Sequence, residues 1–223
     1  MDLPFGSGDP DAFADAPLFR ELQRVMASSS GPVNWELARQ IGIANALEGR
    51  DDPAPSDDDR RLFTEAVRVA ELHIARFTGL EAPTDVVEIK AVRRAEWVNA
   101  NTQSLRELLE PAAQKIASAM GEATREALGA ELPPEMQAMS GMFEQISPLL
   151  LGAQVGSVLG FLGQHVLGQY DIAIPRSGPG ALLFVVPNIA QFEKDWSLDR
   201  TDFRTFVALH EVTHRFEFAR PWA

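Results

Sequence analysis

The stretch VALHEVTHRFEF, at residues 207–218, is the part of the sequence that most directly indicates the fold. Apolar residues recur around it at helical spacing, and no glycine or proline interrupts it. This spacing predicts a helix over residues 201–218. Positions i and i+4 of a helix lie on one face, so the imidazoles of His210 and His214 can converge on a single ion.

Glu211 completes the pattern HExxH with these two histidines. Neutral imidazole is a good zinc ligand, and two histidines leave room for a third protein ligand and a water. Glu211 follows His210 by one residue, about 100° round the helix, so it can reach a zinc-bound water without ligating the metal itself. It can then take a proton from that water, whose pKa zinc lowers to about 7, as the water attacks a carbonyl. The pattern therefore predicts a zinc metallopeptidase, with His210 and His214 as metal ligands and Glu211 as catalytic base.

The sequence next to the motif does not specify the rest of the zinc site. A metzincin continuation would need glycine at position 217 and histidine at position 220, where this chain has Glu217 and Arg220. A gluzincin would supply a glutamate from a second helix downstream, but only nine residues follow His214. The third ligand must then come from upstream or from a segment outside this chain. The upstream candidates, none of which is favoured by its spacing, are His165, Asp171 and Glu193.

Composition is typical of a soluble globular protein. The chain has 223 residues, of which 45% are hydrophobic and 23% charged, enough for one large domain or two small ones. Its net charge of −12 argues against nucleic-acid binding, which needs a basic face. The absence of cysteine excludes disulfides, thiolate metal sites and cysteine nucleophiles. The chain does not open with a basic region followed by an apolar run, so we expect a cytoplasmic protein that acts on a peptide or protein substrate.

Residues 145–170 form a long segment without an acidic or basic side chain. It is long enough to span a bilayer, and Gly152, Gly156 and Gly160 repeat the spacing of small residues in packed membrane helices. Its flanks, however, carry Glu144 and Asp171 instead of the lysine or arginine that anchors membrane helices. We therefore expect no membrane partner and a buried helix, whose glycines let a neighbouring backbone approach closely. A membrane-embedded zinc protease is the alternative.

The remaining patterns predict a mainly α fold with a small strand component. Residues 1–15, rich in Gly, Pro and Asp, are expected to form a flexible tail, and residues 16–223 a single domain. Apolar runs predict strands over residues 86–92 and 181–186, and the second strand could hold an extended peptide at its edge. Further helices are expected over residues 17–26, 35–49, 58–77, 102–119 with a kink or division at Pro111, 121–130 and 135–168.

Details of these helices follow from the same patterns. We expect His73 and His165 to be hydrogen-bonded core residues. The expected N-caps are Asn34, the last residues of the acidic loop 51–59, and Asp199 or Thr201. The side chains of the helix at 58–77 that are expected to be buried are Leu62, Val67, Val69, Ala70, Leu72 and Ile74.

Several longer stretches resemble a known family. They include LLGAQVGSVLGFLGQHVLGQYD at 150–171, VVPNIAQFEKDW at 185–196 and FVALHEVTHRFEFARPW at 206–222. In these the chain resembles the zincin-like metallopeptidases, an HExxH family formerly without assigned function. Some of its members are labelled hydrolases or proteins associated with deazaflavin-coenzyme biosynthesis. The resemblance implies a zincin-like helical domain with zinc held by His210 and His214 and with Glu211 as base. Family members are longer, which implies that the domain over residues 16–223 is incomplete at its C-terminus.

A second class of function stays open, because two histidines alone do not complete a zinc site. In that class the chain is a non-catalytic helical interaction or scaffold protein that retains an incomplete zinc site. Zinc binding without hydrolysis of any peptide would distinguish such a protein from an enzyme.

Overall fold

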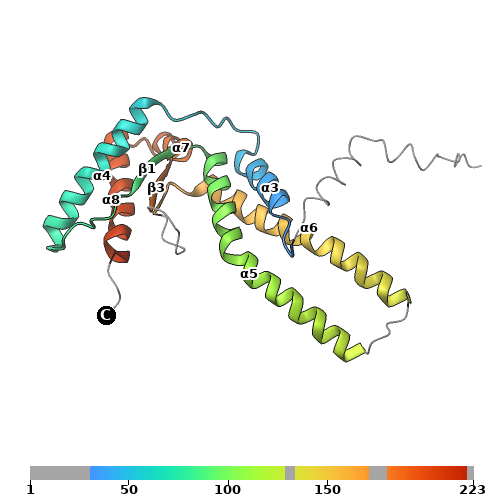
Figure 1. The fold of residues 1–223 in the computed structure, drawn as a ribbon. Coiled ribbons are helices and arrows are strands. Elements are labelled where there is room, and N and C mark those ends of the chain that lie inside the picture. The colour runs from blue at the N-terminus through green and yellow to red at the C-terminus, as the bar shows by residue number, and fades with distance from the viewer. Residues whose placement is uncertain (1–30, 129–133, 171–179, 220–223) are drawn as a thin grey trace, which may run out of the picture. The chain divides into compact units, whose positions relative to one another are not determined.

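The computed structural model describes residues 31–128, 134–170 and 180–219 (Figure 1). Within these residues the chain forms six helices and one three-stranded sheet, so the predicted mainly α fold with a small strand component is confirmed. The expected tail and the expected helix at 17–26 lie outside them. The elements are α3 (Trp35–Leu47), α4 (Asp57–Thr78), β1 (Glu88–Val92), α5 (Arg94–Leu128), α6 (Pro134–His165), β2 (Gly168–Tyr170), β3 (Ala181–Val185), α7 (Val186–Trp196) and α8 (Arg200–Phe218).

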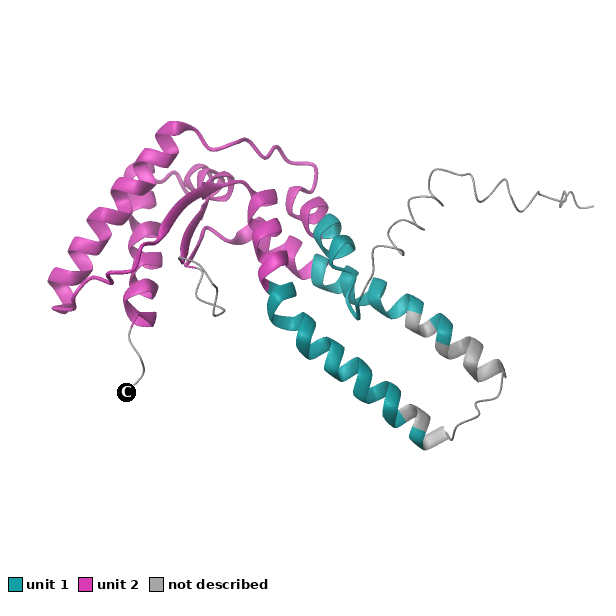
Figure 2. Ribbon diagram, in the orientation of Figure 1, with its two compact units in different colours: residues 1–41, 105–156 teal, residues 42–104, 157–223 magenta. Residues whose placement is uncertain are grey.

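The chain divides into two compact units (Figure 2). Unit 1 consists of residues 1–41 and 105–156, and unit 2 of residues 42–104 and 157–223. Unit 2 contains the sheet and the helices α4, α7 and α8, together with parts of α3, α5 and α6. All three residues of the HExxH motif therefore belong to unit 2.

The sheet of unit 2 has the strand order β1-β3-β2. β3, predicted over residues 181–186, is the central strand, and all five of its residues are buried. It pairs in parallel with β1 and antiparallel with β2. Both edges of β3 are therefore occupied, and the prediction that this strand holds an extended peptide at its edge is wrong. The sequence patterns do not predict β2, because its three residues, Gly-Gln-Tyr, are too few to form an alternating pattern.

The core of unit 2 joins the sheet to α4, α7 and α8. The rings of Phe63 on α4 and Phe184 on β3 stack within it, with centroids 4.3 Å apart. Val69 and Leu72 of α4, which the sequence pattern places in the core, are exposed, because a helix packed on one side buries only one stripe of its surface. The hydrophobic residues that α4 does bury are Phe63, Ala66, Val67, Ala70 and Ile74.

Side-chain caps begin α3 and α4 close to their predicted places. The Asn34 side chain accepts a hydrogen bond from the backbone N–H of Leu37 (2.9 Å), as expected for an N-cap of α3. Ser56, in the acidic loop, caps α4: its hydroxyl accepts from the N–H of Asp59 (3.1 Å). The Asp59 carboxylate in turn accepts from the N–H of Ser56 (2.8 Å), which completes a capping box.

The Asp59 carboxylate also links α4 to α8. It accepts hydrogen bonds from Arg204 and, at 2.7 Å, from Arg200. Arg204 in turn donates to Glu193 Oε1 on α7, at 2.7 Å. Burial alone would raise the pKa of Asp59, but hydrogen bonds from Ser56 and the two arginines outweigh burial and hold that pKa well below its ordinary range.

Substituting Asp59 with asparagine is expected to make unfolding less sensitive to acid. Because the pKa of Asp59 is lower in the folded than in the unfolded chain, its ionised carboxylate stabilises the fold. This stabilisation is fully present above the pKa of the unfolded chain, about 3.9, and is lost as the pH falls below it. Asparagine does not titrate, so the free energy of unfolding should fall less steeply between about pH 5 and pH 2. Urea unfolding measures this slope, with Asp57→Asn as the control because the Asp57 side chain is exposed. An unchanged slope in Asp59→Asn would contradict the prediction.

α5 and α7 differ from what their patterns predict. α5 begins earlier, because the Asp52 carboxylate accepts hydrogen bonds from the N–H groups of Arg94 (3.0 Å) and Ala95 (3.1 Å) and so caps its N-terminus. It then continues through Pro111, so the helix is not divided there. A proline removes one hydrogen bond of a helix, and the turns on both sides continue without it. α7, which no pattern predicts, follows β3 directly with Pro187 in its first turn.

The glycines of α6 lie where another segment approaches closely, as predicted. In unit 1, a Cβ on Gly156 would lie 2.5 Å from the carbonyl oxygen of Ala38. In unit 2, a Cβ on Gly160 would lie 3.0 Å from the carbonyl oxygen of Gly42. The segment Gln145–His165, with a mean hydropathy of 1.6, is long and apolar enough to cross a membrane by length and composition alone. Only 28% of it is buried, so the expectation of a buried helix holds for the glycine face and not for the whole circumference.

Candidate active site

α8 carries the three residues of the HExxH motif. Asp199 caps this helix by accepting hydrogen bonds from the backbone N–H groups of Thr201 (2.8 Å) and Asp202 (3.0 Å), as predicted. On the outer side of the helix, His210 is exposed and His214 is half-buried. The hydrophobic face that α8 buries in the core of unit 2 consists of Val207, Ala208, Val212 and Phe216.

The two histidines converge through their Nε2 atoms, which lie 3.3 Å apart. Their rings are nearly perpendicular, at 83°. Two ligands of a tetrahedral zinc ion, each about 2.0–2.1 Å from the metal, lie about 3.3–3.4 Å from each other. The separation of the His210 and His214 nitrogens therefore fits a pair of zinc ligands.

Glu217 orients one of these imidazoles. Its Oε2 lies 3.0 Å from Nδ1 of His214. When Nδ1 carries the proton, it donates to this carboxylate and leaves the lone pair of Nε2 free on the side of His210. Metal-binding histidines are commonly held in this way by a carboxylate. In the sequence Glu217 stands where a metzincin would have glycine, and its i,i+3 spacing from His214 is a signal for this contact.

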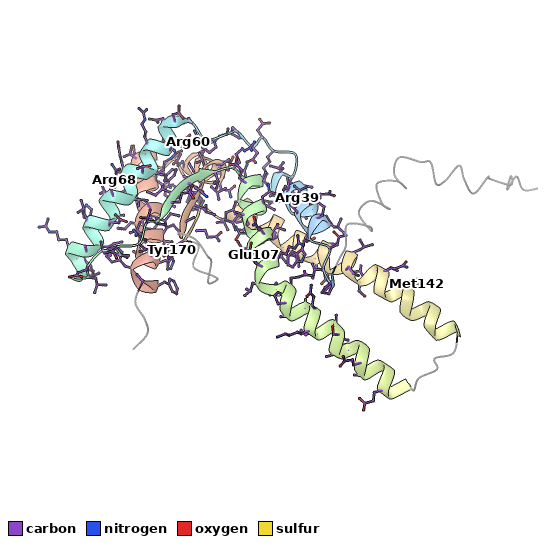
Figure 3. The ribbon with its side chains drawn as sticks, in the orientation of Figure 1. Arg39, Arg60, Arg68, Glu107, Met142 and Tyr170 are labelled. Carbon is purple, nitrogen blue, oxygen red and sulfur yellow. The ribbon has the colours of Figure 1, made fainter. Side chains whose placement is uncertain are left out.

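Glu211 lies on the inner side of α8, with only 6% of its surface exposed. Its Oε2 accepts a hydrogen bond from the backbone N–H of Tyr170 at 2.9 Å; Tyr170 is labelled in Figure 3. Gly168 lies against the same side chain, because a Cβ at that position would be 2.7 Å from Glu211 Cγ. Burial raises the pKa of the Glu211 carboxyl above its ordinary value, although the nearby histidines and the Tyr170 N–H act in the opposite direction. A carboxylate with a raised pKa is well suited to accept a proton.

The upstream candidates for a third ligand do not complete the site in the part of the chain that the structure describes. Glu193 binds Arg204 through both of its carboxylate oxygens. Nδ1 of His165 lies 2.7 Å from the carbonyl oxygen of Phe161, and Asp171 lies outside the described residues. Among residues 31–128, 134–170 and 180–219, no three His, Asp or Glu side chains form a group that could hold a metal ion.

The remaining histidines are not core residues. His73 is exposed on α4, and His165 is exposed at the end of α6. The prediction that both are core residues is therefore wrong, although His165 does have the expected hydrogen-bond partner, the Phe161 carbonyl oxygen. Both helices have an exposed side, and on that side a polar imidazole ring stays in contact with water and pays no desolvation cost.

Comparison with known proteins identifies the class to which this fold and motif belong. The zincin-like metallopeptidase family matches residues 33–223, so the chain belongs to that family. The resemblance inferred from the sequence is thereby confirmed, together with the zincin-like fold.

Among solved structures, the chain is similar to a protein from Chloroflexus aurantiacus that is described as a "putative hydrolase with a novel fold". The two share 33% sequence identity with a TM-score of 0.59, over 83% of this chain and 53% of that one. The chain thus spans about half the length of this neighbour. No curated protein matches the chain.

Proposed function

We propose that this chain is a zinc-dependent hydrolase that cleaves peptide or amide bonds in a peptide or protein substrate. The observation that carries the proposal is the 3.3 Å separation of the His210 and His214 Nε2 atoms, which suits two ligands of one zinc ion. Membership of the zincin-like metallopeptidase family and the description of the Chloroflexus aurantiacus protein as a hydrolase support it. In this proposal His210 and His214 hold the metal and Glu211 is the catalytic base.

The residues of the chain have separate tasks in this reaction. Bound zinc would supply a Lewis acid, which polarises a carbonyl and makes water more acidic. The Glu211 carboxylate accepts a proton from the attacking water and afterwards delivers it to the leaving nitrogen. The Tyr170 N–H holds Glu211 Oε2 during both transfers. Glu217 holds the His214 ring in the tautomer that binds metal through Nε2.

Zinc titration of the purified chain tests the metal site. His210→Ala and His214→Ala should each lower the zinc affinity by more than about 100-fold, because even outer-shell changes at zinc sites cost about 10- to 100-fold. Glu217→Ala should lower the zinc affinity by about 10- to 100-fold, because Glu217 contacts a ligand and not the metal. His73→Ala is the matched control, since it removes an exposed histidine from α4 in the same unit. Equal affinities in the wild type and His210→Ala would overturn the assignment of the ligands.

A non-catalytic scaffold is the second candidate function. One observation favours it: no third ligand group lies with His210 and His214 among the described residues. It predicts zinc binding by the chain without turnover of any member of a peptide library. Hydrolysis that is lost in Glu211→Gln would exclude it.

We also propose that the protein is cytoplasmic and binds neither a membrane nor nucleic acid. The net charge of −12 supports the exclusion of nucleic acid, and Glu144 and Asp171 beside the apolar segment, in place of lysine or arginine, support the exclusion of a membrane. Cell fractionation without detergent is the test, because a membrane-embedded protease would be recovered in the membrane fraction. Such a result would assign the apolar segment Gln145–His165 to the bilayer.

A further inference from the structure

β2 is the part of the sheet that touches Glu211. This strand is only three residues long, and one of its edges is paired with β3. Two of its residues contact Glu211: Tyr170 donates its N–H to Oε2 (2.9 Å), and Gly168 packs against the side chain. Gly168 is needed for space, because a Cβ there would lie 2.7 Å from Cγ and 2.8 Å from Oε1 of Glu211.

Gln169, the residue between these two, is held by the first turns of α5. Its Oε1 accepts hydrogen bonds from Trp97 Nε1 (2.6 Å) and from Asn101 Nδ2 (3.2 Å). Its Nε2 donates to Asn101 Oδ1 (3.0 Å), so the two amides bind each other reciprocally. Asn101 Nδ2 also donates to the carbonyl oxygen of Trp97 (2.9 Å), which ties the cluster to the helix backbone. The Gln169 amide group is therefore held by three hydrogen bonds.

Successive side chains of a strand point to opposite faces, so Gln169 points away from the face on which Gly168 lies against Glu211. β2 is thus held from one side by α5 and supports Glu211 of α8 on the other. A three-residue strand forms few backbone hydrogen bonds with its neighbour. The side-chain amide of Gln169, at the middle of the strand, adds three side-chain hydrogen bonds to α5. The residues that fix Gln169 therefore also fix the backbone that meets Glu211.

We propose that Gln169, held by Trp97 and Asn101, is a positioning residue for Glu211. It keeps β2 at the distance at which the Tyr170 N–H reaches the Glu211 carboxylate and Gly168 leaves it room. Gln169 itself touches neither metal nor substrate in this role. The inference rests on the proposed function only in so far as Glu211 is the catalytic base.

Amide hydrogen exchange at Tyr170, measured by NMR on the full chain, tests the inference without relying on hydrolysis. Glu211→Ala should speed exchange of the Tyr170 N–H about tenfold, the equivalent of one hydrogen bond, and so calibrates the probe. Gln169→Met keeps the length of the side chain but removes all three hydrogen bonds. It should speed exchange at Tyr170 to a similar extent, while the slowest amides of α4 and α8 keep their rates.

Two further variants separate positioning from general stability. Exchanging the two amides, in Asn101→Gln with Gln169→Asn, should restore slow exchange at Tyr170, because the reciprocal pair can form again. Gln191→Met is the matched control: Gln191 on α7 also donates from its side-chain amide, at 2.7 Å to Asp195, but is exposed. It should leave Tyr170 unchanged. If Gln169→Met does not fold, Gln169→Glu replaces it. That change removes the bond donated to Asn101 Oδ1 and sets two oxygens against each other there, so it too should speed exchange at Tyr170.

The outcomes distinguish this inference from the proposed function. Unchanged exchange at Tyr170 in the Gln169 variants, or an equal acceleration of all core amides, would overturn the positioning role and leave the zinc proposal intact. Loss of zinc binding by the wild type with the exchange pattern as expected would overturn the proposed function alone. In an active preparation, Gln169→Met should also lower kcat with KM unchanged, because substrate contacts are untouched.

Discussion

Replacing Glu211 with glutamine is expected to lower the rate of peptide hydrolysis by about 10²- to 10⁴-fold, the usual contribution of a positioned general base. Glutamine has the same shape and can still accept the hydrogen bond from Tyr170, but it cannot take a proton from water. The proposed zinc ligands, His210 and His214, are not altered, so zinc affinity should stay at the wild-type value. Steady-state kinetics and zinc titration on the same preparation measure both quantities.

The same variant should be no less stable than the wild type at neutral pH. Burial raises the pKa of Glu211, which means that the fold disfavours the ionised carboxylate relative to the unfolded chain. A neutral side chain of equal size removes that cost, so the metal-free Glu211→Gln protein should unfold at an equal or higher urea concentration. Loss of activity together with loss of stability would instead indicate a damaged fold. Full activity in a stable Glu211→Gln protein would exclude the proposed base.

The convergence of the two histidines, the proposed metal-binding half of the site, could be predicted because it is local in sequence. His210 and His214 stand on one helix, and the geometry of a helix places positions i and i+4 together whatever surrounds it. The caps at Asn34 and Asp199 could be predicted for the same reason, since a cap involves residues two or three positions apart. The contact between Glu217 and His214 has the same local character and could have been read from its spacing.

The other half of the site depends on contacts between distant residues. Tyr170 and Glu211 are 41 residues apart, and Gln169 and Asn101 are 68 residues apart. A three-residue strand of Gly-Gln-Tyr carries no alternating pattern, so the sequence does not indicate that its backbone meets α8. Nor does a glycine in that stretch reveal whether it serves a turn or, as at Gly168, a close approach.

The partners of charged residues likewise depend on contacts between distant parts of the chain. Glu193, as a carboxylate upstream of the motif, is a candidate for the third zinc ligand by sequence. The structure shows both of its oxygens bound to Arg204, which also binds Asp59 across 145 residues of sequence. Only the packing of three helices decides that these charges form a buried network instead of facing solvent.

Replacing Arg204 with methionine is expected to destabilise the fold by about 3–5 kcal/mol, the usual cost of removing one partner from a buried ion pair. The Arg204 side chain is 3% exposed, and the carboxylates of Asp59 and Glu193 are each 11% exposed. Without the guanidinium, these two carboxylates stay buried with less compensation. Methionine is of similar length and apolar, but it also loses the cation–π contact of the guanidinium carbon, which lies 5.5 Å from the centroid of the Phe63 ring. Urea unfolding of the metal-free chain measures the loss.

Arg200 provides the matched control for this prediction. It also binds Asp59, at 2.7 Å, but its side chain is 46% exposed, so Arg200→Met should cost no more than about 1 kcal/mol. Adding Asp59→Asn and Glu193→Gln to Arg204→Met removes the uncompensated charges and should recover part of the loss. Equal effects of the Arg200 and Arg204 substitutions would contradict a buried network.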